Sequence, residues 1–315
     1  MANVLVVGGA GYVGGNLTTE LSLAGHTVKV FDNLTYEDMY LKKVDFVFGD
    51  ILDFKSVEPH LKWADCVIWL AAFVGDPACA INPELTRKTN VAAVQNLVDN
   101  FAGKIIFPST CSVYGAQDGE LSESSGLNPL SIYAESKLEA EDILKNAHQK
   151  PLIFRLGTLF GLSDQFSRLR VDLVLNFLTI RAVLEKNMSV FGGEQYRPLL
   201  HVKDFATAAI PHITNTSNGI YNLHTENIKI VDLAERIKLR VPKANIVKSA
   251  ISFQDSRNYR VNSERAHLDL QFKPIYTVDY GINEIAELVE SNRITNYSNP
   301  RFTNADTLRI RIGSS

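Results

Sequence analysis

A glycine-rich turn near the start of the chain lies between a predicted strand and a predicted helix. Residues 3–7, Asn-Val-Leu-Val-Val, form the continuous apolar run that a strand buried on both faces requires. Gly8-Gly9-Ala10-Gly11-Tyr12-Val13-Gly14 follows directly, and apolar residues then recur with helical spacing as far as Gly25. A second apolar strand, residues 27–31, ends at Asp32. Strand, glycines, helix, strand and acid in this order predict a turn that binds a dinucleotide.

The residue types in this turn favour NAD as the dinucleotide. Gly9, Gly11 and Gly14 let the backbone approach a pyrophosphate at the positive N-terminus of the helix. Asp32 can accept hydrogen bonds from the hydroxyls of the adenosine ribose. Because its carboxylate would repel a ribose phosphate, NAD is expected rather than NADP. A glycine turn with a purely structural role is the alternative.

Strands and helices alternate through the first half of the chain. Further strands are predicted at 46–48, 66–72, 105–108 and 152–156, with helices at 83–102 and 130–148. This rhythm predicts an α/β fold, a Rossmann-type doubly wound parallel sheet with a smaller C-terminal substrate-binding lobe. We expect residues 1–163 to form the NAD-binding Rossmann domain, its sheet completed by parts of 198–223, and residues 164–315 to form mainly the lobe. In the polar tail 291–315, Leu308, Ile310 and Ile312 alternate, and the pattern does not place this tail.

A second motif joins a strand end to a helix. Strand 105–108 leads to Thr110, and Tyr133-Ala134-Glu135-Ser136-Lys137 follows on the next predicted helix. Tyr133 and Lys137 are four residues apart and project from one helix face. A phenol with an unperturbed pKa of about 10 becomes a better base when an ammonium lies one turn away. Together with a nicotinamide site, the pair indicates proton transfer at a substrate alcohol that Thr110 positions; a chance pair on a surface helix is the alternative.

Composition excludes several classes of protein. The 315 residues are 45% hydrophobic and 21% charged, as expected for a globular chain with a sizeable core. The net charge is −3 without long runs of one sign, so neither nucleic acid nor an anionic membrane is the expected partner. No stretch of 18 apolar residues predicts a membrane span, and the N-terminus lacks the features of a signal peptide. Three cysteines without close spacing indicate a cytoplasmic setting and no metal site.

Many motifs of the chain occur in the same order as the motifs of one protein family. They are Gly8-x-x-Gly11-x-x-Gly14, Asp32, Gly49-Asp50, Leu70-Ala71-Ala72, Asn90, Ser109-Thr110, Val113-Tyr114-Gly115, Tyr133-x-x-x-Lys137, Arg155, Arg197, His201-Val202-x-Asp204 and Asp255-Ser256-Arg257-Asn258-Tyr259. The chain up to about residue 290 resembles the extended short-chain dehydrogenase/reductases, in particular the NAD-dependent epimerase/dehydratase family that acts on nucleotide sugars. The resemblance implies a nucleotide-diphospho-sugar substrate and a homodimer that pairs through helices 83–102 and 130–148.

The same resemblance implies roles for individual residues. Tyr133 is the implied acid/base, Lys137 fixes the nicotinamide ribose, and Thr110 hydrogen-bonds the sugar hydroxyl. The implied cofactor-binding residues are Gly8, Gly11, Tyr12, Val13, Asp32, Asn33, Asp50, Ile51, Leu70, Ala71, Ala72, Asn90, Tyr133 and Lys137. The implied substrate-binding residues are Val74, Thr110, Cys111, Ser112, Asn176, Arg197 and Arg257. Arginine forks suit bidentate phosphate contacts, and ordinary ion pairs are the alternative for both arginines.

One departure from the family pattern narrows the expected reaction. In the family's sugar 4,6-dehydratases, the two residues after the threonine resemble an Asp-Glu pair. This chain has Cys111 and Ser112 at those positions. We therefore expect hydride removal at the fourth sugar carbon without loss of water, and a 4-epimerase as the outcome. A 4-dehydrogenase or ketoreductase is the alternative, and a regulatory protein that holds NAD without turnover is a third. Cys111 is expected to serve packing; the sequence leaves the role of Cys79 open.

Overall fold

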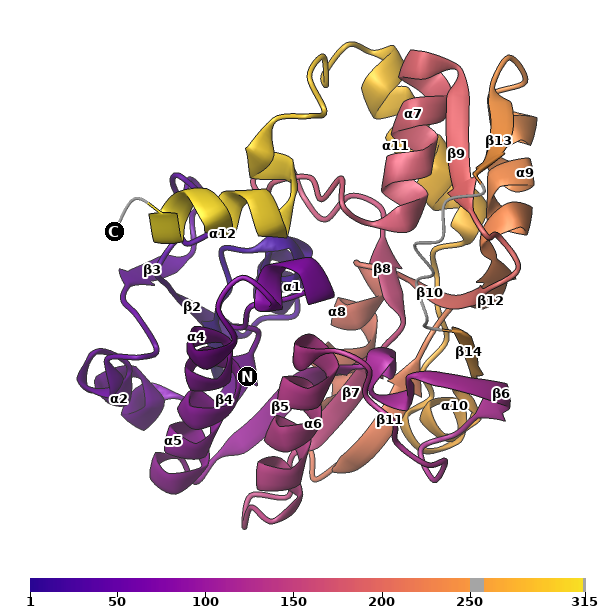
Figure 1. The fold of residues 1–315 in the computed structure, drawn as a ribbon. Coiled ribbons are helices and arrows are strands. Elements are labelled where there is room, and N and C mark those ends of the chain that lie inside the picture. The colour runs from indigo at the N-terminus through magenta and orange to yellow at the C-terminus, as the bar shows by residue number, and fades with distance from the viewer. Residues whose placement is uncertain (250–257, 314–315) are drawn as a thin grey trace.

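The computed structural model describes residues 1–249 and 258–313, and a seven-stranded parallel sheet forms its centre (Figure 1). The strand order is β11-β7-β5-β4-β1-β2-β3. The strands are β1 (Asn3–Val7), β2 (Thr27–Asp32), β3 (Asp45–Phe48), β4 (Cys66–Trp69), β5 (Lys104–Thr110), β7 (Leu152–Leu156) and β11 (Gly219–Leu223). All six neighbouring pairs are parallel. The predicted Rossmann-type fold is confirmed.

Helices cover both faces of this sheet and bury the apolar side chains that the central strands present on each face. One core contains side chains of α1 (Tyr12–Leu23), α8 (Asp204–Ala209) and α10 (Glu264–Leu270). The opposite core contains side chains of α2 (Phe54–Trp63), α5 (Ala93–Asn100) and α6 (Ile132–Lys145). The sheet is therefore the middle layer of three.

The helix predicted at 83–102 is interrupted. It consists of α4 (Pro83–Arg87), a π-helical turn η1 (Lys88–Ala92) and α5. Asn82 caps its N-terminus, since its Oδ1 accepts a hydrogen bond from Leu85 N at 3.0 Å. The π turn contains Asn90, and such turns are frequent at functional sites.

A smaller lobe is built from the segments that follow β7. In it, α7 (Val174–Glu185), α9 (Ile230–Arg240) and α11 (Val278–Glu290) share a core with β9 (Asn187–Phe191), beside β13 (Asn245–Ser249). Two small sheets join the lobe to the central sheet: β12 (Glu226–Lys229), β10 (Tyr196–His201) and β8 (Thr158–Phe160) form one, and β14 (Asn258–Val261) and β6 (Ala116–Leu121) the other. Of the region 198–223, β11 is thus in the central sheet and β10 is not.

The end of the described chain returns to the central sheet. Figure 1 shows the yellow segment leaving α11 in the lobe and ending as α12 (Asn304–Gly313) on the other side of the molecule. There α12 packs against the short helix α3 (Asp76–Cys79), which follows β4. Residues 304–313 of the tail that the sequence pattern did not place therefore form a helix. Within the two described ranges, every helix is too short or too polar to cross a membrane.

Candidate active site

A cavity of about 900 Å³ opens at the carboxyl ends of the central strands. Its walls come from the turns after β1, β2, β4 and β5, from α6, from the lobe and from α12. The carboxyl edge is where doubly wound sheets bind their ligands. Most of the predicted site residues line this one cavity: Gly8, Gly11, Tyr12, Val13, Asp32, Asn33, Asp50, Ile51, Leu70, Ala71, Ala72, Val74, Thr110, Ser112, Tyr133, Lys137 and Arg197.

The glycine turn has the shape that a dinucleotide needs. Gly8 has φ +81°, and a Cβ there would collide with the backbone of Ala71. A Cβ on Gly14 would collide with the carbonyl of Gly9. Gly11 stands at the N-cap of α1 without a capping side chain, and Gly11, Tyr12 and Val13 at this helix N-terminus line the cavity. Backbone donors and the helix dipole together fit a pyrophosphate.

Asp32 anchors the next part of the wall. Its Oδ2 accepts from Ala10 N at 3.0 Å, and its Oδ1 accepts from Leu34 N at 2.7 Å. Burial raises the pKa of this carboxyl, and the two backbone hydrogen bonds oppose that rise. Asn33 Nδ2 donates to Asp50 Oδ2 at 3.0 Å, which ties the turn after β2 to the turn after β3. Carboxylate lone pairs remain for ribose hydroxyls, so these residues fit the adenosine half of NAD.

Thr110, Tyr133 and Lys137 meet at the other end of the cavity. Ser131 Oγ caps α6 by accepting from Ala134 N at 3.2 Å, which fixes where Tyr133 leaves the helix. Burial raises the pKa of the Tyr133 phenol, and a hydrogen bond with Thr110 opposes the rise. The Nζ atom of Lys137 lies 4.0 Å from the centroid of the Phe107 ring, and burial lowers the pKa of this ammonium to about 7. Three side chains that can exchange a proton or stabilise its donor therefore line the same cavity as the glycine turn.

Asn90 supports this site from behind. It is buried, with its Oδ1 accepting from Phe73 N at 2.8 Å and its Nδ2 donating to Phe73 O at 2.9 Å and Ser136 Oγ at 3.0 Å. The π turn thus brings Asn90 against the loop after β4 and against α6. Asn90 lies outside the cavity wall and shapes the loop that leads to Val74.

The three cysteines are free and buried. Cys111 Sγ donates to Arg155 O at 3.2 Å, and Cys79 Sγ donates to Phe73 O at 3.3 Å. Burial raises the pKa of Cys111 well above its usual range and that of Cys79 to about 12. Cys111, although predicted at the substrate, is not part of the cavity wall, whereas its neighbour Ser112 is. The cytoplasmic location stays a prediction.

The predicted substrate-binding residues Arg197, Asn176 and Arg257 differ in where they lie relative to the cavity. Arg197, which is 4% exposed, lines the lobe side of the cavity, and its NH1 donates to Tyr196 O at 2.7 Å. Asn176 is fully buried beneath the wall, where Oδ1 accepts from Gly161 N and Nδ2 donates to Arg170 O, both at 2.9 Å. Arg257 lies outside the described residues.

Comparison with known proteins identifies the family. Residues 4–223 match the NAD dependent epimerase/dehydratase family. The chain belongs to this family. It is 27% identical over 303 residues to UDP-glucuronic acid decarboxylase 1 of Xenopus tropicalis, which covers 89% of this chain and 70% of that protein. It is 28% identical over 323 residues to the uncharacterized UDP-glucose epimerase YtcB of Bacillus subtilis (strain 168). This match covers 90% of this chain and 97% of that protein.

The fold comparison agrees with the family. The structure of UDP-glucuronic acid 4-epimerase from Bacillus cereus, in complex with UDP-glucuronic acid and NAD, superposes with a TM-score of 0.78 at 22% identity, covering 92% of this chain and 99% of that one. The chain therefore belongs to a family of NAD-dependent epimerases and dehydratases. The family match confirms NAD as the cofactor, which was predicted from Asp32.

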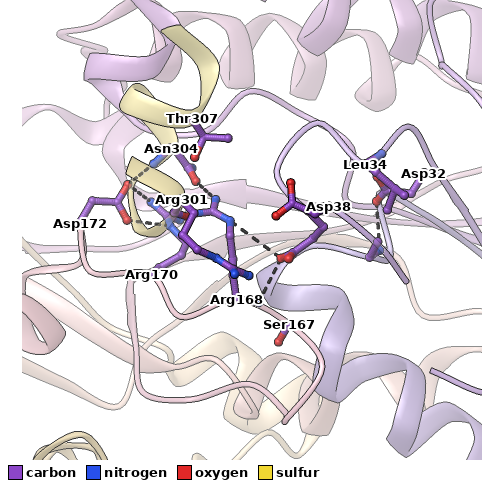
Figure 2. Close-up of polar contacts among 12 residues, drawn as sticks. Asp32, Leu34, Asp38, Ser167, Arg168, Arg170, Asp172, Arg301, Asn304 and Thr307 are labelled. Atoms are coloured by element: carbon purple, nitrogen blue, oxygen red, sulfur yellow. Dashed lines mark hydrogen bonds and ion pairs between the residues drawn. The ribbon is translucent and has the colours of Figure 1, made fainter. Parts of the chain in front are cut away.

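Sequence reasoning missed a polar part of the epimerase-family cavity. Arg168 and Arg170 line it, and Arg170 pairs with Asp172 through contacts of 3.0 and 3.1 Å (Figure 2). Arg168 N donates to Glu37 Oε1 at 3.0 Å, and burial raises the pKa of Glu37 to about 7. The signal was present as Arg168-x-Arg170-x-Asp172, three charges directly before the apolar α7. Charges in that position are unusual for a segment that enters a core.

Proposed function

We propose that the protein is an NAD-dependent nucleotide-sugar 4-epimerase. The observation that carries the proposal is that Thr110, Tyr133 and Lys137 line the same cavity as the dinucleotide turn and Arg197. The cavity volume of about 900 Å³ leaves room for a second ligand beside a dinucleotide. Relatives that cover most of the chain carry names of UDP-sugar epimerases, which supports a UDP-sugar as substrate.

The proposed chemistry follows from three side chains. Thr110 holds the 4-hydroxyl of the sugar, and the Tyr133 phenolate removes its proton. Lys137, one turn along α6, favours the phenolate when it is charged and holds the ribose beside it. NAD, when bound, supplies the hydride acceptor. The Arg197 guanidinium, at the lobe end of the cavity, binds the diphosphate. After the sugar ring has turned, the Tyr133 phenol returns the proton to the ketone oxygen, and with the hydride restored to the opposite face of the fourth carbon the product is the 4-epimer.

Elimination of water is not part of the proposal. It requires an acid and a base next to the fifth and sixth sugar carbons. After Thr110, the Cys111 thiol is buried against Arg155 O, and Ser112 Oγ lies 3.3 Å from the Tyr259 hydroxyl. Neither group replaces a carboxylate pair. The product is therefore expected to keep its oxygen at the sixth carbon.

A second candidate is decarboxylation of a UDP-uronic acid. The relative from Xenopus tropicalis is a UDP-glucuronic acid decarboxylase, and Arg170 in the cavity wall could attract a carboxylate. Oxidation at the fourth carbon places a ketone β to that carboxylate, and the same Tyr133 chemistry would then release carbon dioxide. A 4-dehydrogenase would use the same residues and release the ketone, whereas a ketoreductase would use them to reduce a ketone with hydride from the reduced cofactor.

One experiment separates these outcomes. The purified protein is incubated with NAD and, in turn, UDP-glucose and UDP-glucuronic acid, and the products are analysed by NMR and mass spectrometry. An epimer of unchanged mass supports the proposal. Loss of carbon dioxide supports the decarboxylase, loss of water contradicts the argument from Cys111 and Ser112, and net accumulation of reduced NAD identifies a dehydrogenase. Tyr133→Phe is the control, since every one of these reactions needs its phenol.

A further inference from the structure

The C-terminal segment forms a wall of the cavity that neither the family match, which ends at residue 223, nor the sequence motifs include. Residues of this wall are Thr303, Asn304, Ala305, Leu308, Arg311 and Ile312. Asn304, Leu308 and Arg311 are spaced as one face of α12, and this face is turned toward the cavity. We call residues 301–312 the strap, because they run from the lobe to the half of the molecule that contains the central sheet (Figure 1).

Asn304 makes three of the polar contacts that hold the strap. Its Nδ2 donates to Val74 O at 2.9 Å, in the loop after β4. Its Oδ1 accepts from the Arg168 guanidinium, and its backbone N donates to Asp172 Oδ2 at 3.0 Å. Asn304 is 4% exposed, and Figure 2 shows its side chain next to Arg168 and Arg170. One side chain therefore joins the strap, the loop of Val74 and the segment of Arg168.

The rest of the strap closes over the ends of the cavity. Arg168 NH1 donates to Arg301 O at 2.9 Å, at the start of the strap. Leu308 is 1% exposed and shares an apolar cluster with Phe73, Cys79 and Tyr133. Near the far end, an Arg311 NH2 group lies 3.1 Å from Asp38 Oδ1, beyond the turn of Asp32. The strap thus touches both the adenosine side and the catalytic side of the site.

We propose that the strap retains NAD in the cavity and that Asn304 is the positioning residue that keeps it closed against the loop of Val74. A bound dinucleotide beneath the strap can leave only when these contacts open. Because Asn304 has partners on two other segments, its loss should loosen the wall without removing any group that touches the dinucleotide turn. This inference concerns cofactor retention and holds whichever UDP-sugar reaction the protein catalyses.

The test measures dissociation of reduced NAD by stopped-flow fluorescence, a readout that needs no sugar substrate. Asn304→Ala should release the dinucleotide roughly tenfold faster than wild type, the change expected for one to two lost hydrogen bonds. Asn304→Asp keeps an acceptor for Arg168 but puts an oxygen against Val74 O. This variant should therefore also release reduced NAD faster than wild type.

Thr307→Val is the matched control. Thr307 is buried on the same helix, its Oγ1 donates to Pro300 O at 3.0 Å, and it does not line the cavity. The substitution weakens the helix without affecting the contacts to Val74 or Arg168. The variant should therefore release reduced NAD at a rate within about twofold of wild type. Equal release rates for Asn304→Ala and Thr307→Val, or an unchanged rate in Asn304→Ala, would overturn the proposal. Failure to turn over any UDP-sugar would instead count against the proposed function alone.

Discussion

Lys137 is buried over an aromatic ring, with its Nζ atom 4.0 Å from the centroid of Phe107. The ammonium there has lost most of its water, and burial lowers its pKa to about 7, against the opposing charge of Glu141. A lysine in the unfolded chain has a pKa near 10.4. Between about pH 7 and pH 10 the unfolded state therefore binds more protons, and this residue makes stability rise with pH.

Lys137→Met removes this dependence in the protein without NAD. The variant should be more stable than wild type below about pH 7, by up to a few kcal/mol at ~1.4 kcal/mol per pKa unit. The advantage should shrink as the pH rises and vanish above about pH 10. Urea unfolding at a series of pH values checks the prediction. A constant difference from pH 6 to pH 10 would mean that the ammonium is well solvated or paired.

Tyr133→Phe should keep the fold and NAD binding but lose turnover. Without its hydroxyl the ring cannot carry a proton, and such groups typically contribute ~10²–10⁴ in rate. Steady-state kinetics with whichever of UDP-glucose and UDP-glucuronic acid the protein converts measure the loss. Tyr280→Phe is the control, because Tyr280 packs near His201, outside the cavity, and should change the rate little. Retention of more than about a tenth of wild-type turnover by Tyr133→Phe would assign the base to another residue.

Asp32→Ala should weaken the binding of NAD and reduce the preference for NAD over NADP. The substitution removes the acceptors for ribose hydroxyls and also those that hold Ala10 and Leu34. Hydrogen bonds to a charged group contribute ~1.5–3 kcal/mol, so an affinity loss of about ten- to a hundredfold is expected. Fluorescence titration with both reduced dinucleotides checks this. Asp32→Asn, which keeps one acceptor oxygen, should lie between; an unchanged NADP/NAD ratio in both variants would contradict the assignment.

The cysteines should be inert in the native protein. Burial raises the pKa of Cys66 and Cys79 to about 12, so only about one thiol in ten thousand is ionised at pH 8. A thiol reagent at pH 8 should label the three cysteines of the unfolded chain within minutes and those of the native protein at least ~100-fold more slowly. Rapid labelling of native Cys79, located by peptide mass spectrometry, would show that α3 and the strap open readily.

A homodimer through α4–α5 and α6 is the assembly we predict. The apolar residues Val94 and Leu97 of α5 lie in the core, and the outward residues Gln95 and Asp99 are polar. Pairing through these helices would therefore be a polar contact, weakened by salt. Light scattering at micromolar concentration should give twice the mass of one chain. A single-chain mass at low and high salt would rule this interface out.

The sequence predicted the parts of the site that depend on local geometry. The glycine turn, Asp32 and the Tyr133–Lys137 pair lie within one strand–turn–helix unit or one helical turn, so spacing alone locates them. The strap could not be found in this way, because Asn304 is held by Val74, 230 positions away. The alternation of Leu308, Ile310 and Ile312 also gave no indication of the helix. Leu308 is 1% exposed and Ile310 54% exposed, since the segment is a helix whose cavity face includes Asn304, Leu308 and Arg311.

The edge strand β11 limits how the protein could be recombined. It pairs with β7 from Gly219↔Leu152 to Leu223↔Leu156, although the chain between them has already built β8, α7, β9 and β10 of the lobe. A chimera that keeps residues 1–163 and borrows another lobe would leave β7 as an open, apolar edge prone to aggregation. New substrate preferences on this scaffold are therefore accessible through exchange of the segments that line the cavity, and not through exchange of whole modules.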